Sequence, residues 1–294
     1  MPRFDTPEPI QATIELGIGD VRISASDRSD TVLVVRPTDG ANADDVAAVE
    51  QTRVDYMAGR LLVKAPKKNW RRWSLFSDGG SVDVTIELPA GSHVQGIGIV
   101  AAFRGEGRLG ECRIHTGPGD IQLEQTGPLD VVTAGAVTVA CVAGDAGVST
   151  ASGSIRLGQI EGAAVLKNSN GNTWVGEVTG DVRCQTAHGD IVVEVAHAGI
   201  TAHTANGNVR VGDAVRGMAS LKTACGQIEI GIHAGTAAYL DVFTAFGRVH
   251  NPLGTIEGPE PSEETVEVHA RTSYGDIVIH RSATHPMEHS TERR

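Results

Sequence analysis

The chain has few of the large side chains that fill most globular cores. Aromatic residues make up only 4% of its 294 residues, whereas glycine occurs 36 times. An average glycine content of about 7% would give roughly 20. Few bulky side chains and many glycines favour short strands joined by tight turns. The composition therefore predicts an all-β protein.

Several functional signatures are also missing. The four cysteines, Cys112, Cys141, Cys184 and Cys225, contain no C-x-x-C pair, so we expect free thiols and no metal site. The net charge of −11 argues against nucleic-acid binding. No stretch approaches about 18 consecutive apolar residues, and the N-terminus lacks the regions of a signal peptide. We expect a cytoplasmic protein without a transmembrane segment or a cofactor.

One short segment recurs through most of the chain. Its first residue, here called the marker, is threonine in eight of nine copies, and a small residue, a variable residue and a glycine follow it in all but one shortened copy. The markers stand at positions 116, 133, 150, 168, 186, 204, 223, 244 and 272. The separations of 17, 17, 18, 18, 18, 19, 21 and 28 residues indicate a stacked repeat.

Apolar residues alternate with other residues on both sides of the marker. Around Thr186, for example, Val182 and Cys184 precede the corner, and Ile191 and Val193 follow it. Alternation with period two predicts a strand on each side of the corner, each with one buried face. Coils this short leave no room for a crossover helix, so successive coils must stack and pair their strands in parallel.

The sequence thus predicts a parallel β-solenoid, or β-helix, with coils of about 18 residues. At a strand spacing of about 4.7–4.9 Å, nine layers would make a rod on the order of 40 Å long. We expect a right-handed winding, by analogy with other parallel connections. An antiparallel sandwich is the competing fold, but the constant coil length argues against it.

The repeat does not extend to the ends of the chain. Residues 1–95 are predicted to form an N-terminal β-rich cap and the first strands, because an open solenoid end leaves strand edges to be covered. The solenoid repeats are expected over residues 96–281, with a surface loop at 251–265 between the last two coils. Residues 282–294 are expected to form a disordered tail.

Two local features are predicted inside the N-terminal cap. Residues 41–53 predict a short helix with Asn42 as its N-cap. Alternating residues on both sides of Ala58 and Gly59 predict a hairpin that turns at this pair.

Several quoted segments together resemble a known family. They are GDVRISASDRSDTVLVVRP, VTIELPAGS, the serial T-A-x-G-x-I corners and the late RTSYGDIVI. The chain resembles, over roughly residues 8–280, the bacterial β-strand-repeat proteins of domain of unknown function 4097, often labelled putative adhesins. The resemblance implies a β-repeat fold and, through the adhesin label, export. It brings no catalytic motif.

The corners offer three candidate sites, and each has a structural explanation. The polar residues that follow the glycines are predicted to make turn hydrogen bonds rather than a calcium site, because the G-G-x-G-x-D pattern is absent. The threonine column is predicted to bond within the corners. His188 occupies the variable corner position and is predicted to face solvent. The polar residues are Asp120, Asn172, Asp190, Asn208, Gln227 and Asp276.

One segment, KKNWRRWSLF at 67–76, combines basic and aromatic residues. It is interpreted either as a contact for an anionic membrane surface, nucleic acid or a partner, or as an insertion whose tryptophans pack on the solenoid. Trp174 falls between two inward positions and is predicted to point outward. The candidate contact residues are Lys67, Lys68, Trp70, Arg71, Arg72, Trp73 and Trp174.

These observations favour a non-enzymatic scaffold or protein-interaction protein that binds a protein partner or a second copy of itself. The outward columns gather no pair of carboxylates, so no catalytic residue is assigned. Two alternatives remain open. One is a carbohydrate-binding, adhesin-like or carbohydrate-active solenoid, and the other is a peripheral membrane-associated factor acting through residues 67–76.

Overall fold

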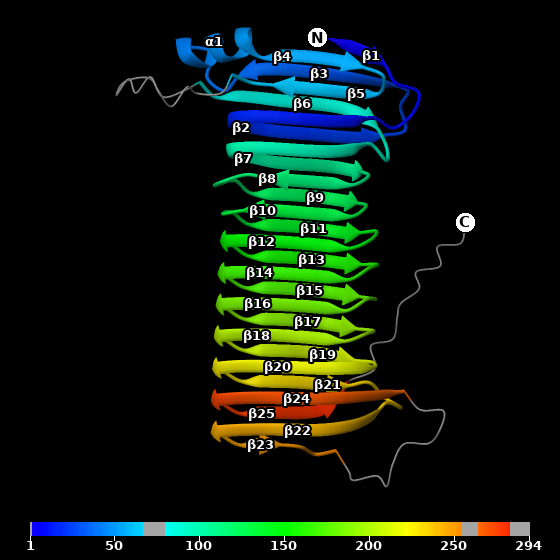
Figure 1. Ribbon diagram of the computed structural model, residues 1–294, viewed down its shortest axis with the longest axis vertical. Helices are drawn as coiled ribbons and strands as arrows, with labels where there is room; N and C mark the ends of the chain where they lie inside the picture. The colour runs from blue at the N-terminus through cyan, green and yellow to red at the C-terminus, as the bar shows by residue number, and fades with distance from the viewer. Residues whose placement is uncertain (1, 67–79, 254–263, 283–294) are drawn as a thin grey trace, which may run out of the picture.

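The computed structural model describes residues 2–66, 80–253 and 264–282, which form one long β-rod (Figure 1). The nineteen strands β7–β25 pair with one another only in parallel. The predicted parallel β-solenoid with an N-terminal β-rich cap is thereby confirmed, and the antiparallel sandwich is excluded.

Each coil contributes one strand to each of two stacks, and the buried faces of both stacks share one core. The strand before each corner belongs to the first stack, which holds β8 (Cys112–His115), β10 (Leu129–Thr133), β12 (Ala146–Ser152), β14 (Ala164–Asn170), β16 (Val182–His188), β18 (Ile200–Asn206), β20 (Gly217–Cys225), β22 (Ala237–Phe246) and β24 (Thr265–Tyr274). The second stack holds β9 (Ile121–Thr126), β11 (Val137–Val142), β13 (Ile155–Ile160), β15 (Thr173–Val178), β17 (Ile191–Ala196), β19 (Val209–Ala214), β21 (Ile228–Ile232), β23 (Val249–His250) and β25 (Ile277–Arg281).

The first coils of the rod precede the repeat in the sequence. Two strands of 16 residues, β2 and β7, each run through both stacks and pair with one another in parallel. β5 and β6 together make the next layer on the other side of β2. The N-terminal elements are β1 (Arg3–Asp5), β2 (Gln11–Ser26), β3 (Asp30–Pro37), α1 (Ala43–Gln51), β4 (Arg53–Met57), β5 (Arg60–Lys64), β6 (Val82–Pro89) and β7 (His93–Arg108).

Antiparallel strands end the stack at the N-terminus. β3 pairs antiparallel with β6, and β4 pairs antiparallel with β5, so the edge of the first layer is covered (Figure 1). The predicted helix and its cap are confirmed, because the Asn42 side chain accepts a hydrogen bond from Asp44 N at 2.9 Å. The hairpin turn is also where it is predicted, with positive φ at Ala58 and Gly59.

The C-terminal end departs from the expected order of coils. β24 lies between β20 and β22, and β25 lies between β21 and β23. The last coil in the sequence is therefore the next-to-last layer of the rod, and β22 with β23 forms the end (Figure 1). The expectation that every coil stacks on the coil before it in the sequence is wrong here. The 28-residue separation before Thr272 is long enough for the last coil to lie between the coil of β20 and the coil of β22.

Backbone contact between coils explains the corner glycines. Gly189 has a φ of +139°, and a Cβ on it would lie 2.2 Å from the carbonyl oxygen of Gly171. Gly207 repeats the arrangement one layer on, with a φ of +146° and a distance of 2.1 Å to Gly189 O. Only glycine satisfies both the dihedral angle and the approach.

Seven of the eight marker threonines are buried, and all but Thr186 donate to a backbone carbonyl of a neighbouring layer, as predicted. Thr150 donates to Gly135 O at 2.7 Å, and Thr204 donates to Gly189 O at 3.1 Å. Asn168 interrupts this ladder, because its amide nitrogen donates to Gly153 O and to Gly171 O. Thr186 Oγ1 is buried without a hydrogen-bond partner.

The polar residues after the corner glycines also link successive layers. Asn172 Oδ1 accepts from the backbone N–H of Asp190 at 3.0 Å, and Asp190 Oδ1 accepts from that of Asn208 at 2.7 Å. The same bond joins Asp120 to Ala136. The predicted turn chemistry is confirmed, and these carboxylates and amides already have backbone partners.

A methyl group added at a corner should destabilise the rod. We expect Gly189→Ala to lower the free energy of unfolding by roughly 3 kcal/mol, because the Cβ meets a backbone oxygen and φ is positive. Gly147→Ala is the matched control, since its nearest neighbour lies 3.6 Å away, and it should change stability by less than about 0.5 kcal/mol. Equal urea midpoints for the two variants would contradict the corner argument.

Restoring threonine at the interrupted corner should stabilise the protein. Asn168→Thr would keep a donor for Gly153 O and free Gly171 O for the Thr186 hydroxyl. We expect a gain of about 1 kcal/mol in urea unfolding, because one buried hydroxyl gains a partner. Thr204→Val, which removes an existing bond of the same ladder, should lose about 1 kcal/mol. A loss of stability in Asn168→Thr would show that the ladder does not govern this corner.

Candidate functional site

Six of the seven predicted contact residues, in the segment 67–76, lie outside the described residues, so their role stays a prediction. The seventh, Trp174, lies on β15 between two fully buried neighbours, Thr173 and Val175. Its indole is half-buried on the outer face, where Nε1 donates to Glu194 Oε1 at 3.2 Å. Arg156 Cζ lies 5.0 Å from its ring centroid. The predicted outward orientation is confirmed.

The corner histidine is a surface residue, as predicted. His188 is exposed, and its Nδ1 lies 3.2 Å from Asn206 Nδ2 of the next layer. In the described ranges, no group of three or more His, Cys, Asp or Glu side chains has the arrangement of a metal site.

The predicted free thiols are confirmed, and two of them belong to the core. Cys112 and Cys184 are buried. Burial raises the pKa of Cys112 to about 11 and that of Cys184 to about 12, since the interior disfavours the thiolate. At neutral pH both side chains are therefore apolar filling rather than nucleophiles.

The C-terminal end of the rod leaves its core partly open. In the inward column of the second stack, Val209, Ile228 and Ile277 are at most 1% exposed, whereas Val249 of the end coil is 43% exposed. Leu240 of β22 is likewise only partly buried against the core. No strand in the described part of the chain pairs with the outer edge of β22.

Exposed aromatic side chains gather at this same end. Of the eight aromatic residues within the described ranges, the four that are largely exposed all lie on β22 and β24. The rings of Phe246 and Tyr274 stack with centroids 4.9 Å apart. We call these four residues the aromatic end cluster: Tyr239, Phe243, Phe246 and Tyr274. Sequence reasoning missed it, although the crowding of aromatics after position 238 in an aromatic-poor chain was a visible signal.

Charged side chains hold the end coil to its neighbour. Asp241 of β22 accepts from Arg271 Nη2 at 2.8 Å and lies 3.2 Å from His269 Nδ1. The His269 bond is the main cause that lowers the pKa of Asp241. Hydrogen bonds to Asp241 and then Glu267 raise the pKa of His269.

The family of the chain follows from its sequence match. A family model described as Toastrack DUF4097 matches residues 11–282. The chain belongs to this family. The Toastrack resemblance drawn from the corner segments is therefore confirmed, and the family is one whose domain has no known function.

Solved structures that resemble this Toastrack chain share little sequence with it. A "putative cell adhesion protein" from Clostridium sporogenes ATCC 15579 is 10% identical with a TM-score of 0.22, covering 95% of this chain and 98% of that one. A "putative adhesin" from Bacteroides fragilis NCTC 9343 is 12% identical with a TM-score of 0.33, covering 95% of both chains. A "putative lipid binding protein" from Parabacteroides distasonis ATCC 8503 is 12% identical with a TM-score of 0.37, covering 96% of both.

Two further findings are negative. No curated protein matches the Toastrack chain. Among the described residues, no helix has the length and apolar character needed to cross a membrane.

The attachment of the end coil should depend on pH. The raised pKa of His269 stabilises the fold fully below its ordinary value of 6.5, and this contribution is lost as pH rises through the folded value. The lowered pKa of Asp241 stabilises the fold above its ordinary value of 3.8, and this is lost as pH falls through the folded value. We expect hydrogen exchange of β22 amides, corrected for intrinsic rates, to be slowest between these values and to quicken towards pH 8.

The control for this pH dependence is His269→Gln. It should remove the quickening of β22 exchange towards pH 8 and leave the exchange of β16 unchanged. Exchange of β22 that is independent of pH in the unmodified protein would contradict the assignment.

Proposed function

We propose that the protein is a non-enzymatic scaffold that associates with a second copy of itself through the open end of its solenoid. The observation that carries the proposal is the aromatic end cluster, whose four side chains are between 56% and 67% exposed. Aromatic residues are enriched at protein interfaces, where they supply large contact areas. Here three of them lie on β22, whose outer edge pairs with no other strand of the described residues.

The edge of β22 lacks the usual protection against pairing. Natural edge strands carry lysine, proline, bulges or a covering element. The sequence of β22, AAYLDVFTAF, contains neither lysine nor proline. Nine of its ten residues pair with β24 without a shift in register. An identical strand from a second copy would therefore have a regular edge on which to add, since no strand of the described residues pairs there.

Charge favours this end as the contact between two copies. The chain carries a net charge of −11, so most of its surface repels a second copy. The single charged residue of β22 is Asp241, and Arg271 and His269 lie beside it. The end therefore offers an approach with little like-charge repulsion.

The two ends of the rod differ, and this limits the assembly. Antiparallel strands end the stack at the N-terminus, so in the described part of the chain only the C-terminal end offers an edge from the parallel stack. Pairing of β22 with β22 of a second copy is isologous and closes after two chains. We therefore infer a two-fold, end-to-end dimer rather than a filament. The non-enzymatic part of the proposal rests on one outward column of the second stack, which holds a single carboxylate in the layers from β9 to β21: Gln122, Thr138, Arg156, Trp174, Val192, Arg210 and Glu229.

Charges placed on the end coil should separate the dimer. In Tyr239→Lys with Phe243→Lys, two like charges from each copy would face each other across the interface. We expect sedimentation velocity to show a dimer for the unmodified protein and a monomer for this variant, with at least a tenfold rise in Kd. The matched control is Val132→Lys with Val165→Lys, which changes outward residues of the same stack in the middle of the rod and should remain dimeric.

Three results would overturn the proposal. One is an unmodified protein that stays monomeric at every concentration, which would mean that the open end is covered by other segments of the same chain. Another is growth beyond the dimer, and the third is equal loss of the dimer in both double variants. Matching circular dichroism spectra would show that each variant is folded.

A further inference from the structure

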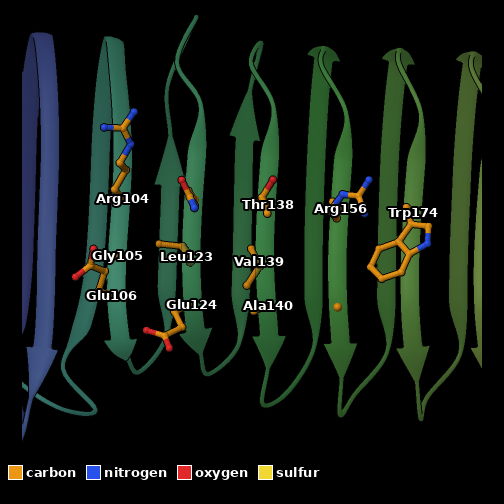
Figure 2. A pocket seen from close by; sticks show the side chains of 12 residues that line it. Arg104, Gly105, Glu106, Leu123, Glu124, Thr138, Val139, Ala140, Arg156 and Trp174 are labelled. Carbon is orange, nitrogen blue, oxygen red and sulfur yellow. The ribbon is translucent and has the colours of Figure 1, made fainter.

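A groove crosses the outer face of the second stack, away from the open end. It has a volume of about 710 Å³ and runs over β7, β9, β11, β13 and β15 (Figure 2). Arg104 and Glu106 lie at one end of the groove, and Arg156 and Trp174 lie at the other, with Thr138 between them. None of the strands that form the groove takes part in the contact proposed for the dimer.

Small residues keep part of the groove's floor low, and at two of them the backbone requires glycine. A Cβ on Gly158 would lie 2.3 Å from Ala140 O, and one on Gly176 would lie 2.4 Å from Gly158 O. Ala140, Gly158 and Gly176 follow one another at the same outward position of successive layers. The depression is therefore part of the rod's construction and is present before any ligand binds.

Trp174 provides an aromatic surface at one end of this floor. Its ring is held in place by the hydrogen bond to Glu194 and by the Arg156 guanidinium. The edge of the ring lies over the Gly176 position, where a Cβ would come within 3.1 Å of it. Figure 2 shows the indole face-on, lying along the sheet. A face of this kind packs against flat apolar groups such as the C–H face of a sugar ring.

The charged groups of the groove are balanced and available. Arg104 and Glu106 lie on β7, Glu124 lies on β9 and Arg156 lies on β13, so the groove is lined by two cations and two anions. No ion pair within the described residues includes any of the four, although Glu124 accepts a hydrogen bond from Gly107 N. Two cations and two anions disfavour a strongly charged ligand of either sign, whereas all four side chains form strong hydrogen bonds with hydroxyl groups.

The length of the groove fits a short linear chain of rings. Five adjacent strands span four intervals, or about 19 Å at the usual strand spacing. A pyranose unit repeats along an oligosaccharide at about the spacing of one strand, so roughly four units would follow the layers. Each unit would meet one outward side chain of the column formed by Arg104, Gln122, Thr138, Arg156 and Trp174.

We propose that this groove binds a neutral oligosaccharide of about four pyranose units. Trp174 stacks on one ring, and Arg104, Arg156, Glu106 and Glu124 bond to hydroxyl groups. The dimer contact lies on other strands, so the two proposals stand independently. No bond is made or broken in this binding.

Calorimetric titration of the full chain with a panel of neutral tetrasaccharides tests the proposal. The panel holds cellotetraose, mannotetraose, maltotetraose and chitotetraose, with tetragalacturonate as the anionic comparison. At least one neutral member should bind, and more tightly than tetragalacturonate. Trp174→Ala should weaken that binding at least tenfold, and Trp174→Phe should retain part of it.

The matched control uses two arginines of the same outward column. Arg156→Ala should weaken binding at least threefold, whereas Arg210→Ala, on β19 beyond the groove, should leave it unchanged. Unaltered thermal unfolding would separate loss of binding from loss of fold. The proposal is overturned if no neutral member binds, if tetragalacturonate binds best, or if binding survives unchanged in Trp174→Ala.

Discussion

Each coil of this rod lies in backbone contact with the next at its corner, and the rest of the structure depends on that contact. Glycines such as Gly189 and Gly207 let one corner approach the carbonyl oxygen of the preceding corner. Threonine hydroxyls and Asx side chains then bond to the same backbone segments one layer away. These repeated contacts keep successive coils in register, so that each inward column becomes a continuous core and each outward column a continuous surface.

The same constraint determines what the surfaces offer. Glycines are also required along the second stack, at Gly158 and Gly176, and the small residues leave a shallow groove where Trp174 provides an aromatic wall. At the C-terminal end of the stack no antiparallel strand from the described part of the chain covers the last layer, and Val249 is exposed although its column is buried elsewhere. The proposed binding groove and the proposed association surface thus arise from a single repeat, the first where the repeat is regular and the second where it ends.

Much of this architecture could be predicted from the sequence, because a marker every 18 residues and period-two alternation specify corner, strand and buried face. The Asn42 cap and the Ala58-Gly59 turn could also be predicted, because the residues at these positions determine such local structures. The position of β24 between β20 and β22 could not be predicted, because both of the last two coils carry the same pattern and either order satisfies it. The groove was missed because it depends on small residues from several layers, and the aromatic end cluster because it depends on which coil is last.

We propose that two rods join at their open ends, with the closed end of each rod pointing away from the contact. Negative-stain electron microscopy of the full chain with a gold-labelled N-terminal tag tests it directly. We expect straight particles of about twice the single-rod length with a gold label at both far ends. Single rods labelled at one end, labels at the centre of the particle, or chains of many rods would contradict it.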